Sequence, residues 1–192
     1  MEEIVEILVE EISMERFLRV ILPQLLPEKF ILDQNCFIRP HEGKSHLQKS
    51  IPKKVRAFKG YTNVNVKLII IHDQDANDCI ALKNDLINLI EEANPSLPKL
   101  IRIACRELEN WYLGDLNAIE QVYPDSRAKQ LKSKARFRNC DNLTGSEEMG
   151  KLSANFTKSF ASREIPKYMS LDENHSISFN HFLNGIRSFL DQ

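Results

Sequence analysis

The strongest constraint on the fold is an alternation between short β-branched apolar runs and longer segments with helical periodicity. Residues 66–71, VKLIII, form the clearest predicted strand, and residues 4–9 form another. Each run is followed by a segment whose apolar residues recur every three or four positions, as in a helix that packs on a sheet. Parallel strands joined by helices produce this alternation. The sequence therefore predicts an α/β fold with a mostly parallel sheet flanked by helices.

Further elements are expected around these two strands. Residues 30–38 are predicted as a weaker strand and residues 100–104 as another. Ser13 is placed to cap the first helix, because a serine side chain can accept a hydrogen bond from a free helical N–H. A basic helix interrupted near Pro52 is expected before the third strand, and a helix over residues 80–93 is expected after it.

The chain is expected to contain an α/β core over residues 1–125 and a helical C-terminal extension, residues 126–192, packed on that core. A chain of 192 residues with 42% hydrophobic residues can bury a core without disulfides or a structural metal. The four cysteines include no CxxC pair, which indicates reduced thiols and no zinc site.

The charge pattern excludes some classes of protein. A net charge of -1 is incompatible with a uniformly basic, nucleic-acid-coating surface, although a local basic path can still exist. No apolar run is long enough to cross a bilayer, so no membrane association is expected. The acidic start, MEEIVEILVEE, differs from the basic start of a signal peptide, which predicts a cytoplasmic location.

Acidic residues follow three of the predicted strands: Glu10, Glu11, Asp73, Asp75, Asp78, Glu107 and Glu109. In an open parallel sheet the carboxyl ends of the strands form the ligand-binding edge. Carboxylates forced together there repel one another unless a cation offsets their charge, and Mg²⁺ prefers such oxygen ligands. The sequence therefore predicts a site for Mg²⁺ or Mn²⁺. A turn or helix-cap role is the alternative for each acid taken singly, above all for Asp78.

The order of these acids resembles the Toprim domain, which topoisomerases, primases and certain nucleases share. That domain has a glutamate after its first strand and a DxD motif after its third. The matches here are Glu10 in LVEEISME, and Asp73 with Asp75 in IIIHDQD. The chain departs from the common pattern at Glu11, where the domain usually has glycine.

More narrowly, the chain is similar to a family of small bacterial Toprim-like proteins of unassigned function. The similarity rests on residues 9–11, 43–45, 73–79 and 105–115, and it covers roughly residues 3–125. Members of that family resemble proteins found beside ATPase genes in anti-phage or mobile-element loci. The resemblance therefore implies an ATPase subunit as a partner and a defence role.

The Toprim resemblance also implies roles for individual residues. Glu10, Asp73 and Asp75 would hold a metal ion. Alternatively, Glu10 would act as a general acid or base instead of binding the metal. A second metal would need further acids, for which Asp78, Glu107 and Glu109 are candidates, Glu109 being preferred; a place in a solvated first helical turn is the alternative for the two glutamates. The implied activity is Mg²⁺-dependent hydrolysis of a nucleic-acid phosphodiester, because the chain has no room for the additional domains of a topoisomerase or primase.

The residues around Gly43 and two basic stretches are candidates for phosphate contact. Gly43-Lys44-Ser45 lacks the earlier glycine of a nucleotide-binding P-loop. Lys44 is instead expected to face the acids and contact a phosphate, and a loop glycine followed by a helix N-cap is the alternative. The candidate nucleic-acid-binding residues are Lys49, Lys53, Lys54, Arg56, Lys132 and Lys134. Such residues give sequence-independent affinity for DNA or RNA; solvated helix faces are the alternative.

Two other functions compete with a nuclease. In one, the fold serves as a non-catalytic interaction or regulatory subunit with weak or no metal binding. In the other, it is a phosphoacceptor module, since receiver-type domains also gather acids at strand ends, although in a different order. His72 is expected to be a packing residue rather than a ligand, and Trp111 is expected in the core or at its rim rather than as a platform for base stacking.

Overall fold

A four-stranded parallel sheet forms the centre of the molecule. The computed structural model describes residues 2–191. The strands lie in the order β2-β1-β3-β4, and all three neighbouring pairs are parallel. Their bounds are β1 Glu2–Val9, β2 Cys36–Pro40, β3 Val64–Asp73 and β4 Lys99–Ala104. The predicted α/β fold is confirmed, and its arrangement is consistent with a Toprim-like sheet.

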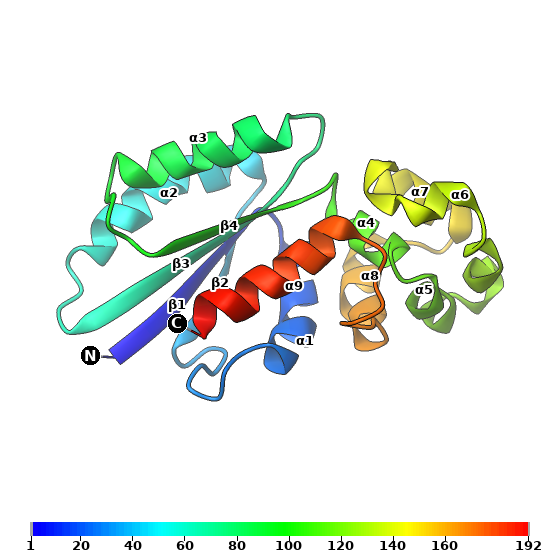
Figure 1. Cartoon of the computed structure of the whole chain (residues 1–192), viewed down its shortest axis with the longest axis horizontal. Helices are drawn as coiled ribbons and strands as arrows, with labels where there is room; N and C mark the ends of the chain where they lie inside the picture. The colour runs from blue at the N-terminus through cyan, green and yellow to red at the C-terminus, as the bar shows by residue number, and fades with distance from the viewer. Residues whose placement is uncertain (1, 192) are drawn as a thin grey trace.

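Helices cover both faces of the sheet, and a helical lobe lies beyond the carboxyl ends of its strands (Figure 1). The helices on the sheet are α1 Ile12–Ile21, α2 Lys44–Phe58, α3 Cys79–Glu91 and α9 Ile177–Leu190. The helices of the lobe are α4 Leu108–Leu113, α5 Leu116–Val122, α6 Ala135–Arg138, α7 Gly145–Leu152 and α8 Lys158–Glu164. Short 3-10 turns are η1 Leu22–Gln24, η2 Pro124–Ser126, η3 Ala128–Leu131, η4 Cys140–Asn142 and η5 Ile165–Lys167.

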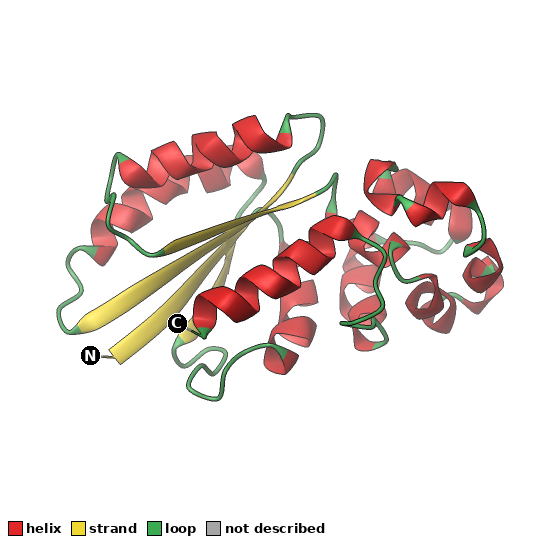
Figure 2. Ribbon diagram, in the orientation of Figure 1, coloured by secondary structure: helices red, strands yellow, loops and turns green. Residues whose placement is uncertain are grey.

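The central strand β3 is apolar on both faces because both are covered, as Figure 2 shows. Leu68 and Ile70 belong to the hydrophobic cluster under α2 and α3. Ile69 and Ile71 belong to the cluster under α1 and α9. Successive side chains of a strand point to opposite faces, so the run VKLIII supplies both cores at once.

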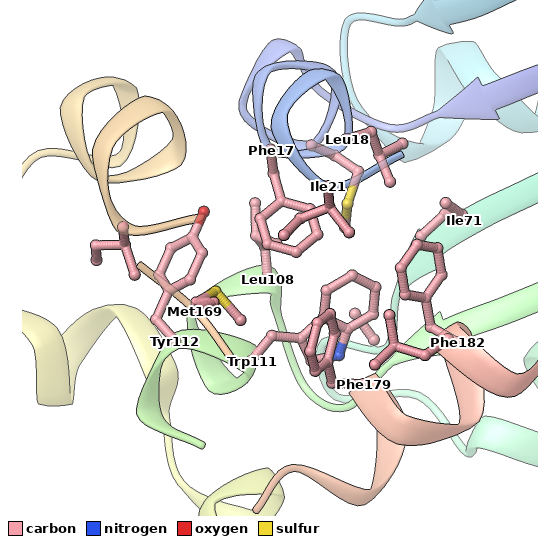
Figure 3. Packing of buried hydrophobic residues seen from close by; sticks show 14 of the residues in the cluster. Phe17, Leu18, Ile21, Ile71, Leu108, Trp111, Tyr112, Met169, Phe179 and Phe182 are labelled. Atoms are coloured by element: carbon pink, nitrogen blue, oxygen red, sulfur yellow. The ribbon is translucent and has the colours of Figure 1, made fainter. Parts of the chain in front are cut away.

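Aromatic side chains join the lobe to the sheet. Trp111 of α4 is fully buried, with its ring centroid 5.4 Å from that of Phe17 in α1 and 4.9 Å from that of Phe182 in α9 (Figure 3). Its indole N–H donates to Ser178 Oγ at 2.8 Å. One hydrophobic cluster thus contains residues from both sides of residue 125.

Three local predictions were wrong. The second strand begins at Cys36 rather than at residue 30, because Asn35 folds the preceding residues into a turn by accepting from Ile31 N and donating to Lys29 O, both at 2.7 Å. Ser13 lies inside α1, where Glu11 is the N-cap residue. Helix α2 continues through Pro52 to Phe58, since its apolar face remains buried against the sheet.

Candidate functional site

The carboxyl ends of β1, β3 and β4 carry the predicted acids toward the helical lobe (Figure 1). Glu10 directly follows β1, Asp73 is the last residue of β3, and Asp75 lies two residues beyond it. Backbone hydrogen bonds join the loop that follows β3 to the end of β4 and to the loop after it, from Gln74 N to Ala104 O and from Asp75 N to Arg106 O, each at 2.9 Å. The parallel register therefore brings acids from separate parts of the sequence to one edge.

Glu10 and Asp73 approach this edge from opposite faces of the sheet. Val9 is paired with Ile71, so Glu10 lies opposite His72 rather than opposite Asp73. His72 Nδ1 is 2.6 Å from Asp73 O and 3.2 Å from Glu10 Oε2. Because a carbonyl can only accept, Nδ1 carries a hydrogen and donates to Asp73 O. His72 is fully buried, in the packing position expected for it.

Asp73 lies near enough to Glu109, the acid from the first turn of α4, for the charge of Glu109 to act on it. Glu109 is 1% exposed, and Asp73 Oδ1 and Glu109 Oε2 are buried atoms without a hydrogen-bond partner among the described residues. Burial raises the pKa of Glu109 to about 7, although Lys158 opposes the shift. Burial, and then the charges of Glu109 and Glu10, raise the pKa of Asp73 well above its ordinary value.

Glu10 supplies a third buried carboxylate oxygen. Its Oε2 accepts no hydrogen bond within the described chain, although His72 Nδ1 lies 3.2 Å away. Burial raises the pKa of Glu10, and the nearby charges of Asp75 and Glu11 raise it further, against the opposing effect of His72. Three buried oxygens therefore accept no hydrogen bond among residues 2–191, although most buried carboxylates do, and those of Glu10 and Glu109 have only ion-pair contacts, with His72 and Lys158.

Two lysines partly offset this negative charge. Lys44, the first residue of α2, places its Nζ 3.1 Å from Asp75 Oδ2, so it faces the acids as expected. Lys158, the first residue of α8, lies 3.6 Å from Glu107 Oε2 and 3.8 Å from Glu109 Oε2. Burial lowers the pKa of Lys158, but the surrounding carboxylates raise it more. No sequence pattern indicated Lys158, which reaches the site only through the packing of α8 beside α1.

The remaining acids have visible structural roles. Asp78 is exposed and caps α3, its side chain accepting from Ala81 N at 2.7 Å. Glu107 accepts from Ser146 N and Ser146 Oγ, at 3.3 and 3.2 Å. These contacts match the cap and turn alternatives considered for single acids.

Asn110 is a buried positioning residue that was not predicted. Its side-chain oxygen accepts from Arg106 N and Glu107 N, and its amide donates to Cys140 O and Leu143 O. It therefore ties the loop after β4 to the lobe. Polar residues at helix starts are common, so the sequence alone offered no signal for this network.

An open hollow lies beside these acids. It has a volume of about 530 Å³ and is lined in part by Asp75, Arg106, Glu107 and Thr144. We refer to it as the acid pocket. Within residues 2–191, no three His, Cys, Asp or Glu side chains are arranged as a ready-made metal site. Asp75 and Glu107 are the acids that line the acid pocket, and the acids of this edge are not in coordinating positions.

The predicted basic residues fall in two places. Lys49, Lys53 and Arg56 follow the i, i+4, i+7 spacing of one face of α2 and are exposed. Lys54 is half-buried on the same helix, whereas Lys132 and Lys134 are exposed in the lobe. The part of the chain that the structure describes provides no acidic partner within 4.0 Å for any of them.

Fold and site together define an α/β protein with a parallel sheet and an acidic, lysine-flanked carboxyl edge. The sequence family described as "Domain of unknown function (DUF4276)" matches residues 9–187, and the chain belongs to this family. No curated protein and no solved structure was found to match the chain. None of the helices in residues 2–191 has the length and apolar character needed to span a bilayer.

Proposed function

We propose that this protein is a Mg²⁺- or Mn²⁺-dependent phosphodiester hydrolase that acts on nucleic acid. The observation that carries the proposal is the set of three buried carboxylate oxygens of Glu10, Asp73 and Glu109 that accept no hydrogen bond within residues 2–191, at the carboxyl edge of the sheet. Leaving a buried carboxylate oxygen without a partner costs free energy. A hard divalent cation bound among them would offset that cost.

The donor set fits such a cation. Glu10 after β1, Asp73 at the end of β3 and Glu109 in α4 would provide oxygen ligands, and Asp75 would provide another at the rim. Oxygen ligands favour Mg²⁺ and Mn²⁺ over metals that prefer nitrogen or sulfur. When bound, such an ion activates water and offsets charge on a phosphate. Since the acids are not in coordinating positions in the described chain, binding requires side-chain rotations, which Asp75 at the exposed rim can make most freely.

The lysines have complementary tasks in this proposal. The Lys44 side chain is 53% exposed and sits at the rim, so it can leave Asp75 to contact a phosphate. Lys158 holds Glu107 and Glu109 in place from the opposite side. Positive charge beside the acids is needed because a phosphodiester would otherwise be repelled by them.

Helix α2 provides a route for the rest of the strand. It starts at the site with Lys44, and Arg56 lies twelve residues further along, or about 18 Å at the rise of an α-helix. The exposed face formed by Lys49, Lys53 and Arg56 would contact successive phosphates. Affinity from such contacts is independent of sequence and falls with added salt.

The first prediction concerns metal binding. Mn²⁺ should raise the melting temperature of the wild type, by a stabilisation of about 2.7 kcal/mol when free metal is a hundredfold above Kd. Asp73→Asn should abolish this shift and cleavage of a DNA and RNA panel, because it removes a charged ligand while keeping the side-chain shape. Asp85→Asn, an exposed change on α3, is the matched control and should behave as the wild type.

A non-catalytic subunit remains the second candidate, favoured by the absence of a ready-made ligand triad in residues 2–191. In that case the wild type would show no metal-dependent melting shift and would cleave nothing. Asp73→Asn would then leave the biological phenotype and partner binding intact. Loss of the phenotype in a folded Asp73→Asn protein would exclude this candidate.

A further inference from the structure

We propose that a second hollow, next to the acid pocket, is a subsite for one unpaired nucleobase and its sugar. The inference rests on the proposed function and specifies its substrate as an unpaired or locally unstacked nucleic-acid strand. This hollow, the edge pocket, has a volume of about 530 Å³ and lies along β4 between α3 and α9. That volume is within the range that holds small organic ligands.

The two hollows share a wall. Gln74, from the loop after β3, and Arg106, from the loop after β4, line both of them. A strand whose phosphate lies in the acid pocket, beside Asp75 and Glu107, would therefore place its neighbouring nucleoside beside Arg106. The exposed guanidinium of Arg106 has no acidic partner among the described residues, so it is free to contact a phosphate or to stack on a base.

The wall of the edge pocket combines apolar and amide groups. Ile103 contributes an apolar surface at its floor, and Ile177 contributes another at its rim. Ile177, the first residue of α9, is 60% exposed, so its side chain is available to a ligand. Asn139 and Asn142 add exposed amides that can bond to the edge of a base. Flat apolar surfaces with a few amides are what an extruded base requires.

The charge of the pocket favours an anionic ligand. Lys83 of α3 is exposed and without an acidic partner in the described chain. Asp141 is the one acid in the wall, and it is engaged by Ser176 Oγ at 2.6 Å and Ser178 N at 2.9 Å. Arg102 donates to His181 O at 3.0 Å and keeps its positive charge. The pocket thus presents free cations, whereas its carboxylate is occupied in holding the start of α9.

A hollow of this shape selects unpaired strands. In a duplex the base faces are stacked and the pairing edges are covered, so a base reaches a pocket only after it leaves the stack. Unstacking costs least in single strands, bulges and ends. We therefore expect single-stranded DNA or RNA to bind more tightly than the same sequence as a duplex.

The test measures fluorescence anisotropy of labelled oligonucleotides with the full chain and Ca²⁺. The single strand should bind about tenfold tighter than its duplex, and one abasic position should weaken binding about tenfold, as expected for the loss of one stacked base. Ile177→Trp, which fills the pocket from an exposed position, and Lys83→Glu should each weaken binding comparably. Arg187→Glu, exposed at the far end of α9, is the matched control and should bind as the wild type.

The outcomes separate the two proposals. Equal affinities for single strand and duplex, or an unchanged affinity in a folded Ile177→Trp protein, would overturn the subsite while metal-dependent cleavage stands. A wild type that binds and cleaves no nucleic acid would overturn the proposed function and the subsite together. Melting temperatures of both pocket variants verify that they are folded.

Discussion

The ionisation of Glu109 is the residue-scale property with the clearest consequence for stability. Its carboxyl is buried and its pKa is raised to about 7, whereas in the unfolded chain it has an ordinary value near 4.5. The unfolded chain therefore loses this proton first as pH rises. The ionisation of Glu109 therefore lowers the stability of the folded protein as pH rises from about 4.5 to about 7, and it has no further effect on stability above pH 7.

Glu109→Gln should consequently be more stable than the wild type at pH 8, in the absence of divalent metal. The advantage should shrink toward pH 4.5, and it is bounded by about 3 kcal/mol for a shift of this size. Urea denaturation at pH 5 and pH 8 in EDTA measures it, with the exposed Glu28→Gln as control. A stability difference of equal size at both pH values would contradict the role assigned to this carboxyl.

At the scale of elements, the order of strands and helices could be predicted, whereas the site's supporting contacts could not. The runs 4–9 and 66–71 identify β1 and β3 because strands covered on both faces are apolar throughout. The edge strand β2 carries less signal, so its start was misplaced by several residues. That acids following separate strands meet at one edge of the sheet can be predicted from the parallel topology alone. Their partners Lys158 and Asn110 depend on how the lobe packs, and local sequence patterns do not contain that information.

The contact between α7 and α4 is an element-scale feature with a direct test. A Cβ on Gly145 would lie 2.6 Å from Asn110 Oδ1 and 2.8 Å from both Asn110 N and Glu109 Cβ. Because one of these atoms is backbone, the clash cannot be relieved by a side-chain rotation. Gly145→Ala should cost about 1–3 kcal/mol, as overpacking does, and should weaken metal binding by displacing Glu109.

Gly150→Ala, in the same helix, is the matched control. A Cβ there meets nothing within 4 Å, so the change should stabilise the protein by up to about 1 kcal/mol through helix propensity. Thermal unfolding of both variants, with and without Mn²⁺, provides the comparison. Similar effects of the two substitutions would show that α7 does not press on the first turn of α4.

At the scale of the whole molecule, the sheet and the helical lobe share one hydrophobic cluster. Trp111, the single tryptophan, stands where α1, α4 and α9 meet (Figure 3). Elements that share a core lose their packing together, which is the condition for two-state unfolding. The lobe is therefore not expected to melt independently of the sheet.

Tryptophan fluorescence and far-ultraviolet circular dichroism should accordingly give coincident urea transitions. Phe182→Ala, which removes a ring stacked on Trp111 at 4.9 Å, should cost about 3–5 kcal/mol and shift both transitions equally. Fluorescence that changes before the dichroism would instead show that the lobe unfolds on its own.

The position of α9 has a consequence for biosynthesis. This helix packs on β4 and, through Ser178, accepts the indole hydrogen of Trp111, although more than seventy residues separate it from β4 along the chain. During translation the strands leave the ribosome well before α9 does. The lobe that places Lys158 and Glu109 shares its core with α9. We therefore expect the acidic site to assemble only after that helix has emerged from the ribosome.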